Sequence, residues 1–143
     1  LGSSDGHMLL YPPSNPDHAS YSLLQRSEHP PINVSMAAID SIMHRLGHSS
    51  VGVVKMDVEG AEFEILASLL GMGECPRESA GCRVLGCTEG PKRGLAFRQL
   101  LVEYHEWAVE DGASIVGDIT RCLELEGFTV VERGGEQWLY AKR

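Results

Sequence analysis

The chain has 143 residues, of which 43% are hydrophobic and 22% charged, and it carries a formal net charge of −8 at pH 7. This length suits one domain that can bury a core of its own. The acidic balance leaves no basic surface for the phosphates of a nucleic acid, and no apolar run reaches the roughly 18 residues of a membrane span, so we expect neither partner.

Residues 1–34 are polar and are interrupted by five prolines. Two short runs, His7 to Tyr11 and Tyr21 to Gln25, predict a small antiparallel ribbon on either side of a proline-rich loop. We expect this segment to be irregular apart from that ribbon.

A helix is predicted from Met36 to Leu46, because Ser35 is a favourable N-cap and apolar residues recur at helical spacing. Gly47 fits the left-handed position that commonly ends a helix. The next apolar run starts at Val51, which is a normal distance for a helix-to-strand connection.

Val51 to Leu70 predicts a strand buried on both faces, then a cluster of carboxylates, then an amphipathic helix. Ligands of open α/β sheets bind at the carboxyl ends of strands, and Asp57 lies at such an end with Glu59 close behind it. Crowded carboxylates favour a bound cation, a metal ion or a retained proton. A purely structural interpretation also remains open, because acidic residues stabilise the first turn of a helix. The cluster comprises Asp57, Glu59, Glu62 and Glu64. The structural interpretation is favoured for the last two of these residues, Glu62 and Glu64.

The segment from Gly71 to Leu95 lacks periodicity and predicts a long loop, which could be an active-site lid or a flexible insert. It contains three of the four cysteines, and the fourth is Cys122. The spacing does not provide the paired C-x₂₋₄-C ligands of a typical zinc site. We therefore expect Cys75, Cys82 and Cys87 to be reduced thiols. A disulfide is the alternative, and a metal site is the least favoured interpretation.

A second apolar strand is predicted from Arg98 to His105. Glu103 and His105 are two residues apart at its carboxyl end and so share a face. If this strand is a parallel neighbour of the Val51 strand, its two ionisable side chains meet Asp57 and Glu59 in one crevice. A functional and a structural role for His105 are both open on this pattern alone.

The rest of the chain predicts a helix and two antiparallel strands: Ser114 to Glu126, Phe128 to Arg133 and Glu136 to Lys142. Gly134 and Gly135 are a strong signal for a two-residue hairpin. Trp138 and Tyr140 alternate on the last strand, and we expect them to pack in the core.

Three short motifs resemble one enzyme family. K-M-D-V-E-G-A-E-F-E-I-L, at residues 55–66, closely resembles the signature of FkbM-type S-adenosylmethionine-dependent methyltransferases. V-E-Y-H, at 102–105, resembles the end of their fifth strand, and the opening L-G-S-S-D-G is similar to the segment after their third strand.

The resemblance implies an α/β fold with an incomplete Rossmann-like (class I methyltransferase) sheet, mostly parallel with a C-terminal antiparallel hairpin. Residues 1–143 would form the carboxyl-terminal part of one methyltransferase domain. Within it, 1–34 would be an irregular or hairpin segment, and 35–143 would follow the order α-β-α-β-α-β-β.

The resemblance also implies methyl transfer from S-adenosylmethionine, to a hydroxyl oxygen of a sugar or another small molecule. Asp57 would contact the sulfonium side of the cofactor or orient the acceptor, and Glu59 and His105 are candidate bases for the acceptor hydroxyl. Glu103 would orient His105 or hold a cation, and no metal ligand is assigned for methyl transfer itself.

The glycine-rich turn that holds the cofactor in such enzymes has no counterpart in the sequence. We therefore expect this chain, as a fragment, to bind S-adenosylmethionine poorly by itself. We also expect an unpaired sheet edge beside the Val51 strand, through which the chain could associate with itself.

Two alternatives remain open on the residues alone. Asp57, Glu59 and Glu103 could hold Mg²⁺ or Ca²⁺ in a hydrolase-type enzyme. The chain could also be a non-catalytic binding module built on half of the domain.

Overall fold

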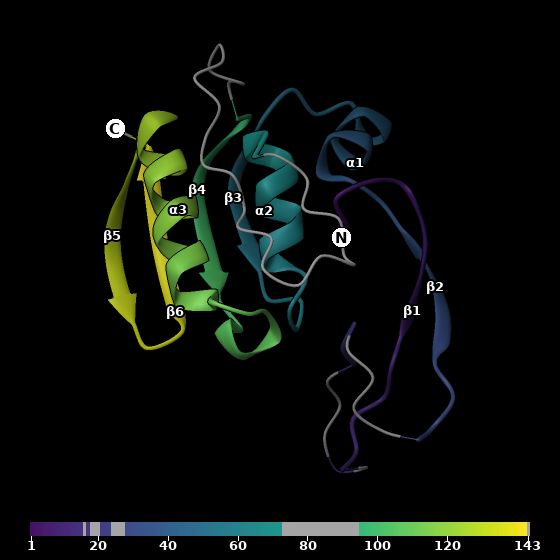
Figure 1. Cartoon of the computed structure of the whole chain (residues 1–143). Coiled ribbons are helices and arrows are strands. Elements are labelled where there is room, and N and C mark those ends of the chain that lie inside the picture. The colour runs from purple at the N-terminus through teal and green to yellow at the C-terminus, as the bar shows by residue number, and fades with distance from the viewer. Residues whose placement is uncertain (16, 18–20, 24–27, 73–94, 143) are drawn as a thin grey trace.

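The computed structural model describes residues 1–15, 17, 21–23, 28–72 and 95–142 (Figure 1). The helices and strands follow one another as β1 (Gly6–Leu10), β2 (Ile32–Met36), α1 (Ile39–Leu46), β3 (Val51–Met56), α2 (Glu62–Leu70), β4 (Phe97–Glu103), the short 3₁₀ helix η1 (Glu106–Ala108), α3 (Gly112–Leu125), β5 (Phe128–Gly134) and β6 (Gln137–Lys142). None of the described helices is long and apolar enough to cross a membrane.

The main sheet has four strands in the order β3-β4-β6-β5, so the fold is mixed α/β. β3 and β4 are parallel, as predicted, whereas β6 runs antiparallel to both of its neighbours. The last strand of the chain therefore lies between β4 and β5 instead of at the edge. Helices α2 and α3 lie side by side against one face of this sheet (Figure 1).

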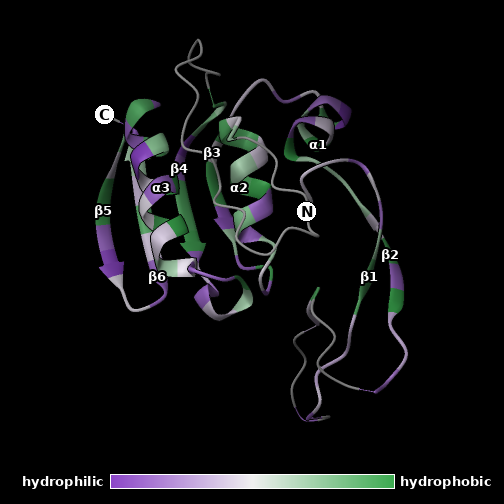
Figure 2. Ribbon diagram, viewed as in Figure 1, coloured by the Kyte–Doolittle hydropathy of each residue, from purple (hydrophilic) through white to green (hydrophobic). Residues whose placement is uncertain are grey.

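The core lies between these helices and the sheet. The side chains that are completely shielded from solvent come from both layers: Leu66 from α2, Leu100 and Val102 from β4, and Ile119 and Leu123 from α3. Figure 2 shows that the hydrophobic residues concentrate along β3, β4 and the neighbouring parts of α2. The opposite face of the sheet is more open, because Val53 on β3 keeps 55% of its surface exposed. The expectation that the strand at Val51 is buried on both faces is therefore wrong.

The N-terminal hairpin pairs differently from the sequence prediction. β1 pairs antiparallel with β2, and the described residues of the Tyr21 segment contribute one bridge, between Tyr11 and Ser22. Residues 24 and 25 of the predicted second run lie outside the described residues. The partner was missed because the stretch that forms β2 was divided between the loop and the following helix.

Helix α1 consequently starts at Ile39, and Ser35 belongs to β2 instead of capping the helix. A residue far away in the sequence binds its N-terminus, because the Asp5 carboxylate accepts a hydrogen bond from the backbone N–H of Ala38 at 2.8 Å. That bond holds the pKa of Asp5 below its usual value. The predicted end is confirmed, because Gly47 adopts the left-handed conformation with φ 70°.

The C-terminal predictions are confirmed in outline. β5 and β6 form the hairpin around Gly135, and Trp138 and Tyr140 are both buried. Cys122, for which the sequence analysis made no prediction, is buried on α3 and is disulfide-bonded. The other three cysteines, and with them nearly all of the predicted Gly71 to Leu95 loop, lie outside the described residues.

Two tyrosines form a hydroxyl network inside the core. The Tyr140 hydroxyl lies 3.2 Å from that of Tyr104 and 2.9 Å from the Thr120 hydroxyl oxygen. Burial raises the pKa of both phenols above the ordinary value. The folded protein therefore keeps the two phenols neutral at a pH where the unfolded chain would ionise them.

We expect this difference to make the protein less stable in alkali. Neutral phenols favour the fold fully below the unfolded pKa of about 10, and the contribution is lost as pH rises above it. The free energy of unfolding in denaturant should fall from pH 9 to about pH 11, and Tyr140→Phe should make that fall shallower. Tyrosinate absorbance should appear in full only on unfolding; complete ionisation in the folded state would contradict the prediction.

Candidate active site

The carboxyl ends of β3 and β4 bring three ionisable side chains together. Asp57 directly follows β3, Glu103 is the last residue of β4, and His105 lies two residues further on. Because the strands are parallel neighbours, these ends meet at the same edge of the sheet. One potential ligand atom from each of the three side chains lies within 4.8 Å of the others. The convergence expected from the sequence is thus present.

A buried carboxylate holds the histidine in place. Glu62, the first residue of α2, is completely buried, and its Oε1 lies 2.9 Å from Nδ1 of His105. The same carboxylate accepts hydrogen bonds from the backbone N–H groups of Val58 and Gly60, at 2.8 and 2.9 Å. These three partners compensate a charge that would otherwise be costly to bury. A carboxylate at Nδ1 favours the tautomer with its proton there, which leaves the Nε2 lone pair available.

The turn between β3 and α2 has an unusual backbone. Glu59 has φ 52° and Gly60 has φ 103°, both in the left-handed region. A non-glycine residue in that region is uncommon, costs about 1–3 kcal/mol and needs support from its surroundings. Here the Ser22 hydroxyl donates to the Glu59 carbonyl at 3.1 Å. Gly60 is also required for space, since an added Cβ would lie 2.7 Å from Cβ of Ala108.

The turn directs the fourth predicted side chain towards the histidine. Oε2 of Glu59 lies 3.8 Å from Nε2 of His105, which is an ion-pair distance but too long for a hydrogen bond. His105 is only 6% exposed, and the ring of Trp107 packs edge-on against it with the centroids 5.5 Å apart. Glu59 therefore joins the cluster from the loop.

The two strand-end carboxylates have polar neighbours of their own. Asp57 accepts a bond from Nζ of Lys55 at 3.3 Å, and both side chains are exposed, so this pair adds at most about 1 kcal/mol to stability. Glu103 accepts a hydrogen bond from Nε2 of Gln137 at 3.1 Å.

Two sequence-based expectations are corrected here. The residue that bonds Nδ1 of His105 is Glu62, whereas Glu103 had been predicted either to orient His105 or to hold a cation. The N-cap residue of α2 is Ala61, and the carboxylate of Glu62 binds the N–H groups of Val58 and Gly60 that precede it. The sequence analysis had given Glu62 only a stabilising role in the first turn of the helix and missed its bond to His105. The available signal was its position two residues after Gly60, which lets its carboxylate reach the backbone of the turn. Glu64 agrees with its structural interpretation, being exposed and bonded to the Ser3 hydroxyl.

A cavity of about 390 Å³ adjoins this cluster. Asp57 and Glu59 lie at one part of its wall, and apolar side chains from the N-terminal segments form much of the rest: Met8, Leu10, Leu23, Val34 and Met36. The hairpin β1–β2, which is distant in sequence, therefore borders the candidate site.

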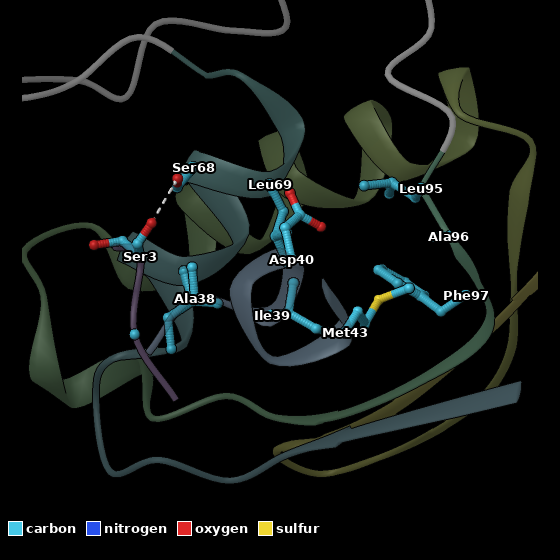
Figure 3. A pocket seen from close by; sticks show the side chains of 12 residues that line it. Ser3, Ala38, Ile39, Asp40, Met43, Ser68, Leu69, Leu95, Ala96 and Phe97 are labelled. Carbon is cyan, nitrogen blue, oxygen red and sulfur yellow. Dashed lines mark hydrogen bonds between the residues drawn. The ribbon is translucent and has the colours of Figure 1, made fainter. Parts of the chain in front are cut away.

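A second cavity of about 400 Å³ lies between α1, α2 and the start of β4 (Figure 3). Asp40, Met43 and Phe97 line it, and Ser68 there donates a hydrogen bond to the carbonyl of Ser3 at 3.2 Å. None of the predicted site residues borders this cavity, so the cavity beside Asp57 is the one that concerns the chemistry.

The fold and the site together define an α/β protein with a carboxylate–histidine cluster at the carboxyl ends of two parallel strands. The profile of the Methyltransferase FkbM domain matches residues 1–130, which is most of the chain. The chain therefore belongs to the FkbM methyltransferase family, as the three motifs indicated. No curated protein and no solved structure matches it.

We predict that Glu62 is the largest single polar contribution to the stability of this site. Glu62→Ala would leave two backbone N–H groups and the His105 ring without their acceptor, and it should lower the free energy of unfolding by about 3–5 kcal/mol. Glu64→Ala, in the same helix but exposed, should cost no more than about 1 kcal/mol. Denaturant unfolding of both variants measures the difference, and equal losses would contradict the prediction.

Proposed function

We propose that the protein transfers a methyl group from S-adenosylmethionine to a hydroxyl oxygen of a sugar or another small molecule. Methyl transfer follows from the family, whereas the donor and the acceptor oxygen are the proposed parts. The observation that carries the proposal is the pairing of His105 Nδ1 with the buried Glu62, because it leaves Nε2 free to take a proton. A base of this kind suits a hydroxyl acceptor, which must lose a proton as its oxygen is methylated.

The sheet supports a Rossmann-like, class I arrangement for the domain. Two parallel strands carry the site at their carboxyl ends, as ligand sites of open α/β sheets do. The last two strands form the C-terminal antiparallel hairpin that the resemblance implies, and the final strand also pairs antiparallel with the second parallel strand.

The roles of the side chains follow from their positions. His105 would accept the hydroxyl proton, and Glu59, whose carboxylate lies 3.8 Å from Nε2, would stabilise the resulting imidazolium. Asp57 is exposed at the end of β3 and would orient the acceptor or contact the positively charged side of the donor. Glu103, which lies close to His105 and Asp57, would add negative charge to the site.

The energetic demands of the reaction are consistent with such a site. Alignment of donor and acceptor for in-line displacement is worth up to about 7–11 kcal/mol, and a positioned base adds on the order of 10²–10⁴ in rate. The apolar wall supplied by the hairpin would help to exclude water, which is the competing acceptor. The bound donor would supply an electrophilic methyl group on a sulfonium, and the chain supplies positioning and the base.

We predict that Asp57→Asn lowers kcat/KM for methyl transfer by about 100-fold, because the substitution removes a charge at the reacting centre without burying a new group. Formation of S-adenosylhomocysteine would be followed with a panel of sugars and hydroxylated small molecules. The protein should be expressed with any residues that its gene places before Leu1.

Asp40→Asn serves as the matched control, since that carboxylate lines the other cavity. Near-normal turnover of Asp57→Asn, or an equal loss in Asp40→Asn, would remove Asp57 from the mechanism. The absence of methyl transfer to every acceptor in the panel, despite bound donor, would argue against a hydroxyl target.

We also propose that the 143-residue chain associates with a second copy through β3. In the described part of the chain β3 pairs only with β4, so its other edge presents unpaired backbone groups. The N–H of Val51 bonds to the β4 side at Ala96. Because successive groups along a strand alternate in direction, the N–H of Gly52 points to the free edge.

Gly52→Pro should therefore shift the population towards monomer, since proline removes an outward donor and is tolerated on edge strands. Gly52→Ala is the control, because an added Cβ meets nothing within 4 Å and the N–H is kept. Light scattering over a range of concentrations measures the association. A wild-type chain that stays monomeric throughout would contradict the proposal.

A further inference from the structure

The cluster at the strand ends has the composition of a metal site. Asp57, Glu103 and His105 each place a potential ligand atom within 4.8 Å of the other two. Ligands that share one ion at bond lengths near 2.1 Å lie about 3–4 Å apart, so small side-chain movements would close the set. We propose that these three side chains bind a divalent metal ion of the first transition row.

The histidine provides an independent reason for this proposal. Its side chain is 92% buried, since only 8% is exposed, and the ring is fixed by the bond from Nδ1 to Glu62. Within the described residues no hydrogen bond engages Nε2, whose acidic neighbour Glu59 stands 3.8 Å away. A ring nitrogen presented in this way, with the other held by a carboxylate, is the usual arrangement of a metal-binding histidine.

Both carboxylates retain an oxygen for the ion. Lys55 donates to Oδ2 of Asp57, and Gln137 donates to Oε2 of Glu103. The other carboxylate oxygens, Oδ1 of Asp57 and Oε1 of Glu103, take no part in these two hydrogen bonds. Lys55 is also largely exposed and could move aside at little cost. Negative charge concentrated around one imidazole favours a bound cation.

The mixture of donors selects the class of ion. Carboxylates alone suit Mg²⁺ and Ca²⁺, whereas an imidazole nitrogen shifts the preference towards Mn²⁺, Fe²⁺ or Zn²⁺. Of the three ligands only Asp57 borders the 390 Å³ cavity, so water or an oxygen of a small molecule would reach the ion from the side of Asp57. The binding proposal stands on these residues and does not depend on the identity of the methyl acceptor.

Mn²⁺ itself is a suitable probe, because its electron paramagnetic resonance signal separates free from bound ion. We expect the wild-type chain to bind one Mn²⁺, and Zn²⁺ to displace it. Asp57→Asn and Glu103→Gln should each weaken binding by 10-fold or more, because loss of a residue that only orients a ligand already costs about 10–100-fold in metal affinity. His105→Gln should do the same if it folds.

Asp40→Asn is the control for simple loss of negative charge, and its affinity should stay within about twofold of wild type. Asp57 is exposed and Glu103 half-buried, so these two variants decide the matter even if the histidine variant is unstable. No saturable binding at about 10⁻³ M Mn²⁺, the weak limit of functional oxygen-ligand sites, would overturn the proposal. Equal weakening in Asp40→Asn would overturn it too, because it would indicate diffuse attraction to an acidic protein.

Discussion

The site depends on the burial of one carboxylate. Glu62 is shielded completely from solvent, and an ion in that position is tolerable only if all of its bonds are made. Its three partners are Val58 near the start of the β3–α2 turn, Gly60 within that turn, and His105 two residues after β4. A single ionised side chain thereby ties together the start of a helix and the ends of two neighbouring strands.

This constraint explains the geometry of the turn. The two backbone N–H groups can reach the carboxylate of Glu62 only if the chain reverses sharply after Val58, and Glu59 and Gly60 make that reversal with positive φ. Gly60 adopts it without strain, whereas Glu59 does so at a cost that the Ser22 hydroxyl and the buried bonds of Glu62 offset. The strain is located at the residue that faces His105, where backbone strain is often associated with function.

Much of the main sheet could be predicted from the sequence, because its signals are local. Val51–Met56 is a short, mostly apolar run followed at once by Asp57, and Phe97–Glu103 is a second such run that ends in an ionisable residue. The glycines near 135 indicate the hairpin. Parallel pairing of the first two then places Asp57 and His105 together by geometry alone. The convergence followed from the order of elements and did not need side-chain detail.

The parts that could not be predicted depend on contacts between distant residues. The cap of α1 comes from Asp5, 33 positions before the N–H it binds, and the partner of β1 is β2 beyond the proline-rich loop. The role of Glu62 was hidden for the same reason. An acidic residue at the start of a helix is expected whether it is exposed and interacts with the helix dipole or is buried. Only the packing of β4 decides that Glu62 is buried.

The same geometry bears on the choice between a base and a metal ligand for His105. Both roles need the proton on Nδ1 and the lone pair on Nε2, and the bond to Glu62 provides both conditions. They differ in what Nε2 meets: an acceptor hydroxyl in one case and an ion held by Asp57 and Glu103 in the other. The two roles are exclusive at any moment, because one lone pair cannot bind a metal and accept a proton. If an ion occupies the site, the acceptor hydroxyl would have to be activated by the metal or by Glu59, and His105 would become a ligand whose orientation Glu62 controls.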